Sequence, residues 1–498
     1  MKKAIISSFL ILLMSVSAIP AQAEELPIKE EIIYSIMVDR YNNGNQTLDE
    51  QVNLEDPKAY YGGDIQGITN KLDEIKKYGF TTISLSPIMA NAAGGYHGYW
   101  IEDLFKVDEQ FGSMADLKKL VKEAHKRDMK VVLELVTNFV APSHPLANDP
   151  SKADWTKETT VEDTLWLDNT LTLNQANPEV KEMLFNAATF WLEEANIDGY
   201  KLHAVDQASP AFLTELAEHV KTVKPDAYLL GGVLKKDQLS EEQLNAGIPL
   251  IEYPAIQESI VNVFTNVGTP VSELYETWAN TGKREGLVYV DNAYMERFTR
   301  QIVEGKLNPQ TTWKLALAYM YTSPGVPLVF QGSEVPMDGR TTEEVLQLVQ
   351  FNSGDTKVRD FLEKISAIRT QFPALSHGDF NLVDSNGAMS VFKRTYKDET
   401  MFIAFNNDTG TKAISVSDVP EGKQLSGLLG DNIVRENEQD EYKIALDRET
   451  VEIYIVEEDH GLNWIYISMV ISIFVLFVGG IMILSYKQKK RERKSKSL

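Results

Sequence analysis

The stretch Asp198–Val205 reads DGYKLHAV, and its residues Gly199–His203 predict a strand that ends at polar side chains. It is one of eight strand-like stretches that alternate with helix-like segments between Ile32 and Phe372. This alternation is typical of a parallel sheet wrapped by helices, and eight strands fit a closed (β/α)8 TIM barrel. The other seven predicted strands are Ile32–Val38, Thr81–Leu85, Val131–Leu135, Ala227–Leu230, Leu250–Tyr253, Leu287–Asp291 and Val326–Phe330.

One domain follows the barrel, and one subdomain is inserted within it. Short alternating strands with Asn and Asp turns between them predict an all-β domain of the β-sandwich type over residues 377–458. We assign the barrel to residues 24–376, with a short inserted subdomain after strand three at residues 139–170.

Helix starts are expected at Ser113, which begins a capping box, and at Asn177, which precedes a first-turn proline.

Both ends of the chain carry membrane-related signals. Residues 1–23 hold two lysines, an apolar run and an Ala-Gln-Ala site, which is typical of a secretory signal peptide. Residues 464–486 contain no charge and would span about 34 Å as a transmembrane helix. Residues 487–498 carry seven Lys and Arg against one Glu, so this basic tail is expected in the cytoplasm and the rest of the chain outside. We therefore expect a single-pass protein of a bacterial cell membrane.

The charge of the remaining chain limits its partners. The net charge is −23, and removing the two leader lysines and the net six positive charges of the tail leaves −31 on residues 24–463. So acidic a domain argues against nucleic acid or anionic surfaces as partners. The absence of cysteine excludes disulfides and favours a bacterial source.

Four of the strand ends carry a family resemblance. DGYKLHAV resembles the α-amylase motif G-F/Y-R-x-D-A-V, Leu229–Leu234 (LLGGVL) resembles L-L-G-E-V-W, Val290–Tyr294 (VDNAY) resembles F-x-D-N-H-D, and Val132–Phe139 (VLELVTNF) resembles D-V-V-x-N-H. The first strand, YSIMVDRY from Tyr34, and the eighth, GVPLVFQGSE from Gly325, are similar too. The resemblance covers roughly residues 30–457.

The resemblance implies that the three reacting positions have changed. The nucleophile position holds His203, the general-acid position Gly232 and the transition-state-stabilising position Tyr294. Retaining glycoside hydrolysis needs two carboxyl groups about 5–5.5 Å apart, which these residues cannot supply. We therefore expect no catalytic residue, and we do not expect replacement by the nearby acids, which are Glu134, Asp206, Glu252 and Asp291.

A sugar-contacting loop is retained. Tyr96–Trp100 (YHGYW) resembles the family loop in which the His bonds the sugar and the second Tyr stacks on it, so His97 and Tyr99 are candidate substrate-binding residues. The alternative is that this loop persists only because it packs the barrel mouth. Since Phe139, Ala293 and Tyr294 make the pocket apolar, we expect weak binding of an α-glucan or cell-wall glycan.

A calcium site is also expected from the resemblance. The matching positions are Asn43, Asn45, Asp49, Gly62 and Asp64, and oxygen ligands on a glycine-bent loop suit Ca²⁺. The alternative is a simple Asn-Gly-Asn turn.

The first functional hypothesis is an inactive α-amylase-like protein on the cell membrane that binds a glycan or a membrane-protein partner. The alternatives are a residual α-glucan hydrolase or transglycosylase of carbohydrate metabolism, and a calcium-dependent structural element of the cell surface.

Overall fold

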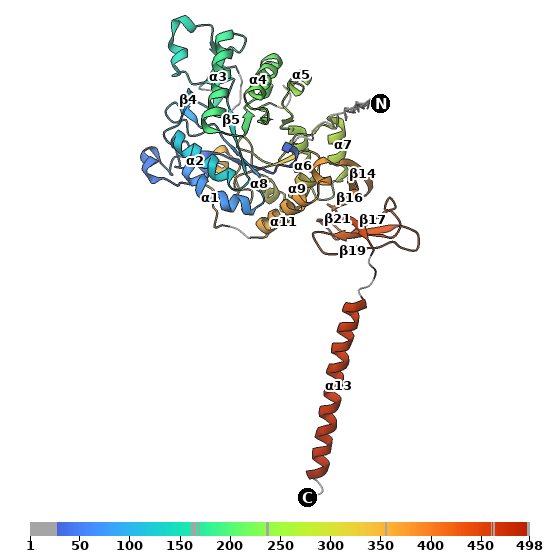
Figure 1. The fold of residues 1–498 in the computed structure, drawn as a ribbon. Helices are drawn as coiled ribbons and strands as arrows, with labels where there is room; N and C mark the ends of the chain where they lie inside the picture. Colours follow the sequence, from blue (N-terminus) through green and yellow to red (C-terminus); the bar gives the residue numbers. More distant parts are fainter. Residues whose placement is uncertain are drawn as a thin grey trace, which may run out of the picture. The chain divides into compact units, whose positions relative to one another are not determined.

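The computed structural model describes residues 27–160, 166–167, 170–235, 239–353, 356–459, 461 and 464–495 (Figure 1). The predicted signal peptide at residues 1–23 lies outside these residues. The chain forms two compact units. The first comprises residues 1–254, 285–297 and 324–354, and the second residues 255–284, 298–323 and 355–498.

The first unit contains an eight-stranded parallel sheet, which confirms the predicted barrel strands. Its order is β11-β10-β9-β5-β2-β1-β13-β12, and an isolated parallel bridge between Glu252 and Leu287 joins the two end strands. Aliphatic residues fill these strands because both faces are buried. The strands are β1 (Ile33–Ile36), β2 (Thr82–Leu85), β5 (Lys130–Leu135), β9 (Gly199–Leu202), β10 (Tyr228–Gly231), β11 (Leu250–Ile251), β12 (Leu287–Val288) and β13 (Val326–Phe330).

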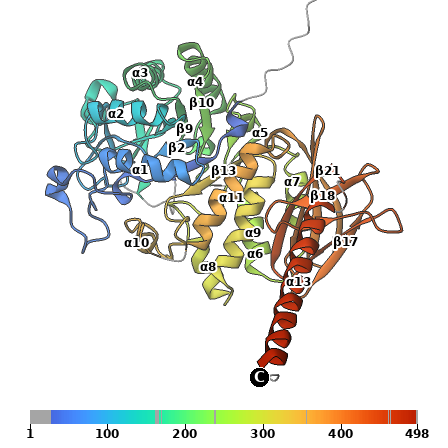
Figure 2. The same cartoon turned by 60° about the horizontal axis from the view of Figure 1, so that its bottom comes forward.

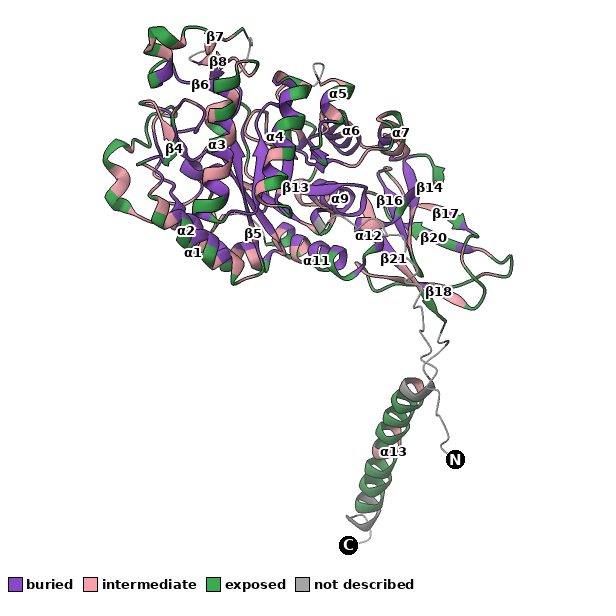
Figure 3. Cartoon of the chain, turned by 45° about the horizontal axis from the view of Figure 1, so that its top comes forward, coloured by how far each residue is buried: buried purple, intermediate pink, exposed green. Residues whose placement is uncertain are grey.

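Amphipathic helices follow these strands, and Figure 3 shows buried strands beside helices whose outer faces are exposed. The predicted capping box is present, since Ser113 and Asp116 bond each other's main chain at the start of α2. Asn177 caps α3 ahead of Pro178, as predicted. The helices of this unit are α1 (Ile65–Lys77), α2 (Met114–His125), α3 (Pro178–Ala195), α4 (Pro210–Val223), α5 (Glu241–Leu244) and α10 (Thr342–Val345).

Two small β elements extend from the first unit. One is the hairpin of β3 (Met89–Asn91) and β4 (Ile101–Val107). The other is the insertion after β5, a three-stranded sheet of β6 (Phe139–Val140), β8 (Leu171–Leu173) and β7 (Thr156–Glu158). The second lies at the predicted place and reaches slightly beyond residue 170.

The second unit joins helices to the carboxyl-terminal β domain, and Figure 2 shows α9 and α11 side by side within it. The helices are α6 (Pro254–Thr265), α7 (Ser272–Asn280), α8 (Phe298–Glu304), α9 (Pro309–Thr322), α11 (Lys357–Gln371) and α12 (Ala374–His377). One sheet has β14 (Asp379–Asn386), β15 (Met389–Tyr396), β16 (Glu399–Asn406), β21 (Thr450–Glu458), β18 (Lys423–Gly427) and β19 (Ile433–Val434), and the other β17 (Lys412–Val416) and β20 (Tyr442–Leu446).

These two sheets share one core. Phe402 and Tyr454 of the larger sheet pack with Ile414 and Ile444 of the smaller one. The arrangement fits the predicted β domain, because alternating residues of facing sheets interdigitate in such a core.

A buried asparagine links the β domain to the helices of its unit. The Asn407 amide donates to the main-chain oxygens of Val263 (2.8 Å), Asn266 (3.3 Å) and Thr269 (3.1 Å). Asn407 is fully buried, so water cannot replace these bonds.

The carboxyl-terminal helix α13 (Trp464–Ser495) is long and apolar enough to cross a membrane. Within its segment Ile467–Arg491, an 18-residue window has a mean hydropathy of 2.8, and none of that window is buried against the protein. By length and composition it is a candidate span.

We predict that Asn407→Ala lowers the free energy of unfolding by about 1–3 kcal/mol, because it leaves buried carbonyl groups without a donor. Urea unfolding followed by circular dichroism measures the change. The matched control is Asn381→Ala at an exposed position of the same unit, which should change stability little. Equal effects of the two substitutions would show that the Asn407 link carries no stability.

Candidate active site

The barrel mouth is lined by residues at the carboxyl ends of neighbouring strands. Glu134 of β5 pairs in register with Lys201 of β9, so parallel pairing sets the two side chains next to each other. His203 follows β9 and Glu252 follows β11. All four side chains are buried.

One ion pair and one contact between a histidine and a carboxylate organise these residues. Lys201 Nζ lies 2.8 Å from Glu252 Oε1, and His203 Nδ1 lies 2.9 Å from Glu134 Oε1. The Tyr99 hydroxyl also donates to Glu134 Oε1, at 3.2 Å. Since buried charges are costly unless they are paired, these contacts keep the cluster in place.

The opposite charges in this cluster keep Glu134 and Lys201 ionised despite their burial. Burial alone would raise the pKa of Glu134, but Lys201 and His203 outweigh it and hold that pKa below its usual range. Burial would lower the pKa of Lys201, but Glu252 and Glu134 raise it. Glu134 is therefore a carboxylate and Lys201 an ammonium at neutral pH.

The Lys201 side chain fills the space beside Gly232. A β-carbon added at Gly232 would lie 3.1 Å from Lys201 Cε and 3.5 Å from Nζ. At this position, which the family resemblance assigns to the general acid, a side chain would begin in contact with the Lys201 methylene and ammonium groups.

One ring nitrogen of His203 is hydrogen-bonded, and the other has no hydrogen-bond partner among the described residues. The Glu134 carboxylate can only accept, so His203 Nδ1 donates to it. Nε2 is buried and has no hydrogen-bond partner in the described part of the chain. The Tyr294 hydroxyl lies 3.4 Å from Nδ1. Burial and then the nearby Tyr99 raise the pKa of Tyr294 well above its ordinary value, so its phenol stays protonated.

The predicted sugar-binding residues reach the mouth, but an aromatic ring covers them. Trp166 of the inserted segment stacks on Tyr99 with ring centroids 5.3 Å apart and on His97 at 4.8 Å. Tyr99 and His97 are buried, whereas Trp166 is half-buried. Burial, and then Arg40, lowers the pKa of His97 to about 3, so that ring is neutral.

Sequence reasoning missed the position of Trp166, and nothing in the pattern around it predicts stacking on a distant loop. It also missed the Lys201–Glu252 pair, for which a signal existed. Lys201 replaces the family's Arg, and a lysine on a buried strand needs a carboxylate close by.

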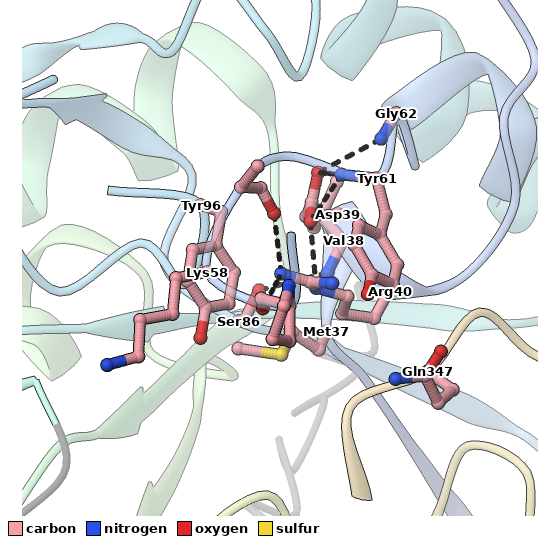
Figure 4. A network of polar contacts seen from close by, with 12 residues as sticks. Met37, Val38, Asp39, Arg40, Lys58, Tyr61, Gly62, Ser86, Tyr96 and Gln347 are labelled. Carbon is pink, nitrogen blue, oxygen red and sulfur yellow. Dashed lines mark hydrogen bonds and ion pairs between the residues drawn. The ribbon is translucent and has the colours of Figure 1, made fainter. Parts of the chain in front are cut away.

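The loop that carries Tyr96 and His97 is held by the short 3-10 helix Val38–Arg40 that follows β1, and Figure 4 shows Tyr96 beside Arg40. The Arg40 guanidinium lies between the rings of Tyr61 (3.7 Å) and Tyr96 (4.1 Å). Its Nε is 2.9 Å from the Asp39 carboxylate, which accepts from the main-chain N–H of Tyr61 and Gly62. Burial raises the pKa of Asp39 to about 7, although Arg40 opposes this. These contacts fix Tyr96, whose hydroxyl accepts from Trp166 Nε1 at 3.3 Å.

The five residues of the expected calcium loop separate into two groups. Asn43, Asp49 and Gly62 converge: Asn43 Nδ2 lies 2.9 Å from both Asp49 oxygens, and a β-carbon at Gly62 would meet both side chains. Asp64 instead caps α1 and accepts from the main-chain N–H of Gly44, Asn45 and Gly67, while the Asn45 side chain accepts from Thr47.

The described residues contain no group of three or more His, Asp or Glu side chains that could hold a metal. Asn43 Oδ1, however, is buried and has no hydrogen-bond partner among them. An oxygen left open beside the Asp49 carboxylate is the feature of this loop that suits a hard cation.

The chain matches two known domain families. The α-amylase catalytic domain matches residues 35–164 and 153–374, and the α-amylase C-terminal domain matches residues 378–454. Among solved structures, an α-amylase from Anoxybacillus is 42% identical with a TM-score of 0.83, and covers 87% of this chain and 99% of its own. The acarbose-bound α-amylase from Geobacillus thermoleovorans is 39% identical with a TM-score of 0.80 and the same coverage.

Curated relatives are more distant. An intracellular maltogenic amylase from Bacillus subtilis is 25% identical over 425 residues, which are 79% of this chain and 71% of that protein. A cyclomaltodextrinase from Thermoanaerobacter pseudethanolicus is 26% identical over 434 residues, which are 79% of this chain and 72% of that protein.

These relatives contradict our first functional hypothesis, an inactive membrane protein that acts only by binding. They are named as amylases and a cyclomaltodextrinase, and two α-amylases retain about two-fifths identity along almost their whole length. The sequence interpretation was wrong because it judged activity from three motif positions alone. The chain belongs to the α-amylase family, with an α-amylase catalytic domain followed by an α-amylase C-terminal domain.

Proposed function

We propose that the protein is an enzyme that hydrolyses or transglycosylates α-glucans. The observation that carries this proposal is the buried cluster of two carboxylates, one ammonium and one imidazole at the barrel mouth. The 42% identity with the Anoxybacillus α-amylase supports the substrate class.

The reacting groups must differ from those that the family motifs imply, since positions 203, 232 and 294 carry no carboxylate. In our proposal His203 is the acid and base. Its protonated Nε2 gives a proton to the glycosidic oxygen as the bond from C1 to that oxygen breaks. Water then adds to C1, and its released proton returns to Nε2.

The two carboxylates have separate roles in this scheme. Glu134 holds His203 Nδ1 and stabilises the imidazolium form. Glu252 stabilises the positive charge that develops at C1, and Lys201 holds Glu252 in position. Because Tyr99 is covered, the half-buried Trp166 offers the aromatic face on which a pyranose stacks.

We predict that the purified full chain in detergent converts maltoheptaose into shorter maltooligosaccharides by hydrolysis or into longer ones by transglycosylation. Mass spectrometry and a reducing-end assay measure the products. Glu252→Gln and His203→Asn should each lower kcat by about 10²–10⁴-fold, because each removes a group that acts in the transition state. Glu109→Gln, at the surface, is the matched control and should keep full activity.

Thermal unfolding of each variant separates loss of chemistry from loss of fold, because Glu252→Gln leaves Lys201 with one carboxylate fewer. Wild-type protein that forms no product above a buffer blank would overturn the proposal. Full activity in both His203→Asn and Glu252→Gln would overturn the assignment of roles.

We also propose a calcium site formed by Asn43 and Asp49 beside Gly62, without the side chains of Asn45 and Asp64. The partnerless Asn43 Oδ1 and the adjacent carboxylate support it. When bound, Ca²⁺ would be held by these oxygens and would fix the loop that precedes α1.

Added Ca²⁺ is predicted to raise the melting temperature of the full chain relative to chelator, because an ion bound only to the folded state stabilises it. Asp49→Asn should remove most of this rise. Asp56→Asn, at an exposed turn of the same region, should keep it. Identical melting curves of wild-type protein in Ca²⁺ and in chelator would exclude the site.

A membrane tether through α13 is the third proposal, with the basic tail in the cytoplasm and the two units outside. Its support is the exposed apolar segment Ile467–Arg491 followed by positive charge.

In a bacterial host we expect the full chain to sediment with membranes and to resist extraction by alkaline carbonate, whereas a chain ending at Asp459 should stay soluble. Protease added to intact spheroplasts should digest the tethered units and spare the tail. Full protection of those units from the protease would show that the orientation is opposite to the proposed one. A full chain that stays in the soluble fraction would exclude the tether.

A further inference from the structure

The second unit contains a cleft of about 590 Å³ that the barrel mouth does not share. It is lined by residues of α9 and α11, of the loop between β18 and β19, and of β20, β21 and the turn between them. Small-ligand sites in proteins typically measure roughly 300–1,000 Å³, so the cleft is large enough for a small molecule or a short polymer segment.

The wall formed by Leu429 and Gly430 is fixed in place. The buried Glu452 carboxylate accepts from the main-chain N–H of Leu429 (2.7 Å) and of Gly430 (2.8 Å). Lys364 Nζ donates to the Leu429 oxygen at 2.9 Å. Because both main-chain groups of Leu429 are bonded, this side of the cleft needs no reordering when a ligand enters.

The opposite wall presents an aromatic ring next to a cation. Phe361 of α11 is half-buried, and Lys314 Nζ of α9 lies 5.8 Å from its ring centroid. Lys314 has no ion-pair partner within the described residues. A half-exposed aromatic face suits the C–H face of a sugar ring, and a free ammonium can donate to its hydroxyl groups.

The polar lining points to an uncharged ligand that is rich in hydroxyl groups. Thr311 and Asn432 can each donate and accept, Lys314 donates, and Glu449 accepts. Ammonium and carboxylate groups occur together, so neither an anion nor a cation meets a field of one sign. A sugar hydroxyl both donates and accepts, and this matches the mixed lining.

We propose that this cleft is a second saccharide-binding site that holds a short stretch of an α-glucan chain. The choice of glucan rests on the proposed function, whereas the preference for a neutral saccharide rests on the lining alone. A glucan chain long enough to reach from this cleft to the barrel would be held more tightly than at either site, because the second contact is intramolecular. A short oligosaccharide would occupy one site at a time and gain nothing.

The first experiment measures binding without turnover. Full-length protein in detergent is mixed with insoluble starch granules, and the bound fraction is measured for the wild type, Phe361→Ala and Lys314→Met. We expect both substitutions to weaken granule binding at least fivefold. Phe105→Ala, which removes an exposed phenylalanine from the first unit, is the matched control and should bind like the wild type.

The second experiment compares substrates of different length. Phe361→Ala should raise the KM for soluble starch about fivefold or more, with kcat unchanged and the KM for maltotriose unchanged. A purely structural effect of the substitution would change maltotriose kinetics or the melting temperature too.

The outcomes separate this proposal from the proposed function. Starch binding that depends on Phe361 and Lys314 in a wild-type protein without turnover would support the cleft and refute the enzyme. Turnover together with unchanged granule binding and starch KM in Phe361→Ala and Lys314→Met would refute the cleft and leave the enzyme. Weaker granule binding in Phe105→Ala but not in Phe361→Ala would assign the binding surface to the first unit and overturn the proposal.

Discussion

The buried ammonium of Lys201 is the charge on which the barrel mouth depends. It lies 2.8 Å from Glu252 and stands in register with Glu134 on the neighbouring strand. Burial would raise the pKa of Glu134, and Lys201 is the largest influence that holds this pKa below its usual range. The ionised Glu134 in turn fixes the orientation of His203 through Nδ1. The positions of Glu134, Glu252 and His203 in the mouth therefore depend on one lysine.

The barrel could be predicted from sequence because its strands leave a strong and repeated pattern. Each strand is a short run of buried aliphatic residues between helix signals, and all eight were found within a few residues of their observed ends. The boundaries that shifted are those at polar ends. Strand β11, for example, ends at Ile251, although Glu252 still bridges to Leu287, and α6 begins at Pro254.

The site was less predictable because its contacts cross large distances in sequence. Trp166 lies on an insertion and stacks on Tyr99, and no local periodicity in the sequence predicts this contact. Asp64 matched a metal-ligand position, yet its oxygens are used by three main-chain amides at the start of α1. The functional error had the same origin. Motif positions state which side chains are missing, but only the fold shows that Glu134, Lys201 and Glu252 meet in space.

The contact between Lys201 and Gly232 makes these two positions sterically coupled. A β-carbon at position 232 would lie 3.1 Å from Lys201 Cε, which is tighter than an ordinary van der Waals contact. The Lys201 side chain cannot move away freely, because its ammonium is held 2.8 Å from Glu252 Oε1. Any side chain placed at 232 would therefore strain the ion pair between Lys201 and Glu252, and a substitution there would be felt on the far side of the mouth.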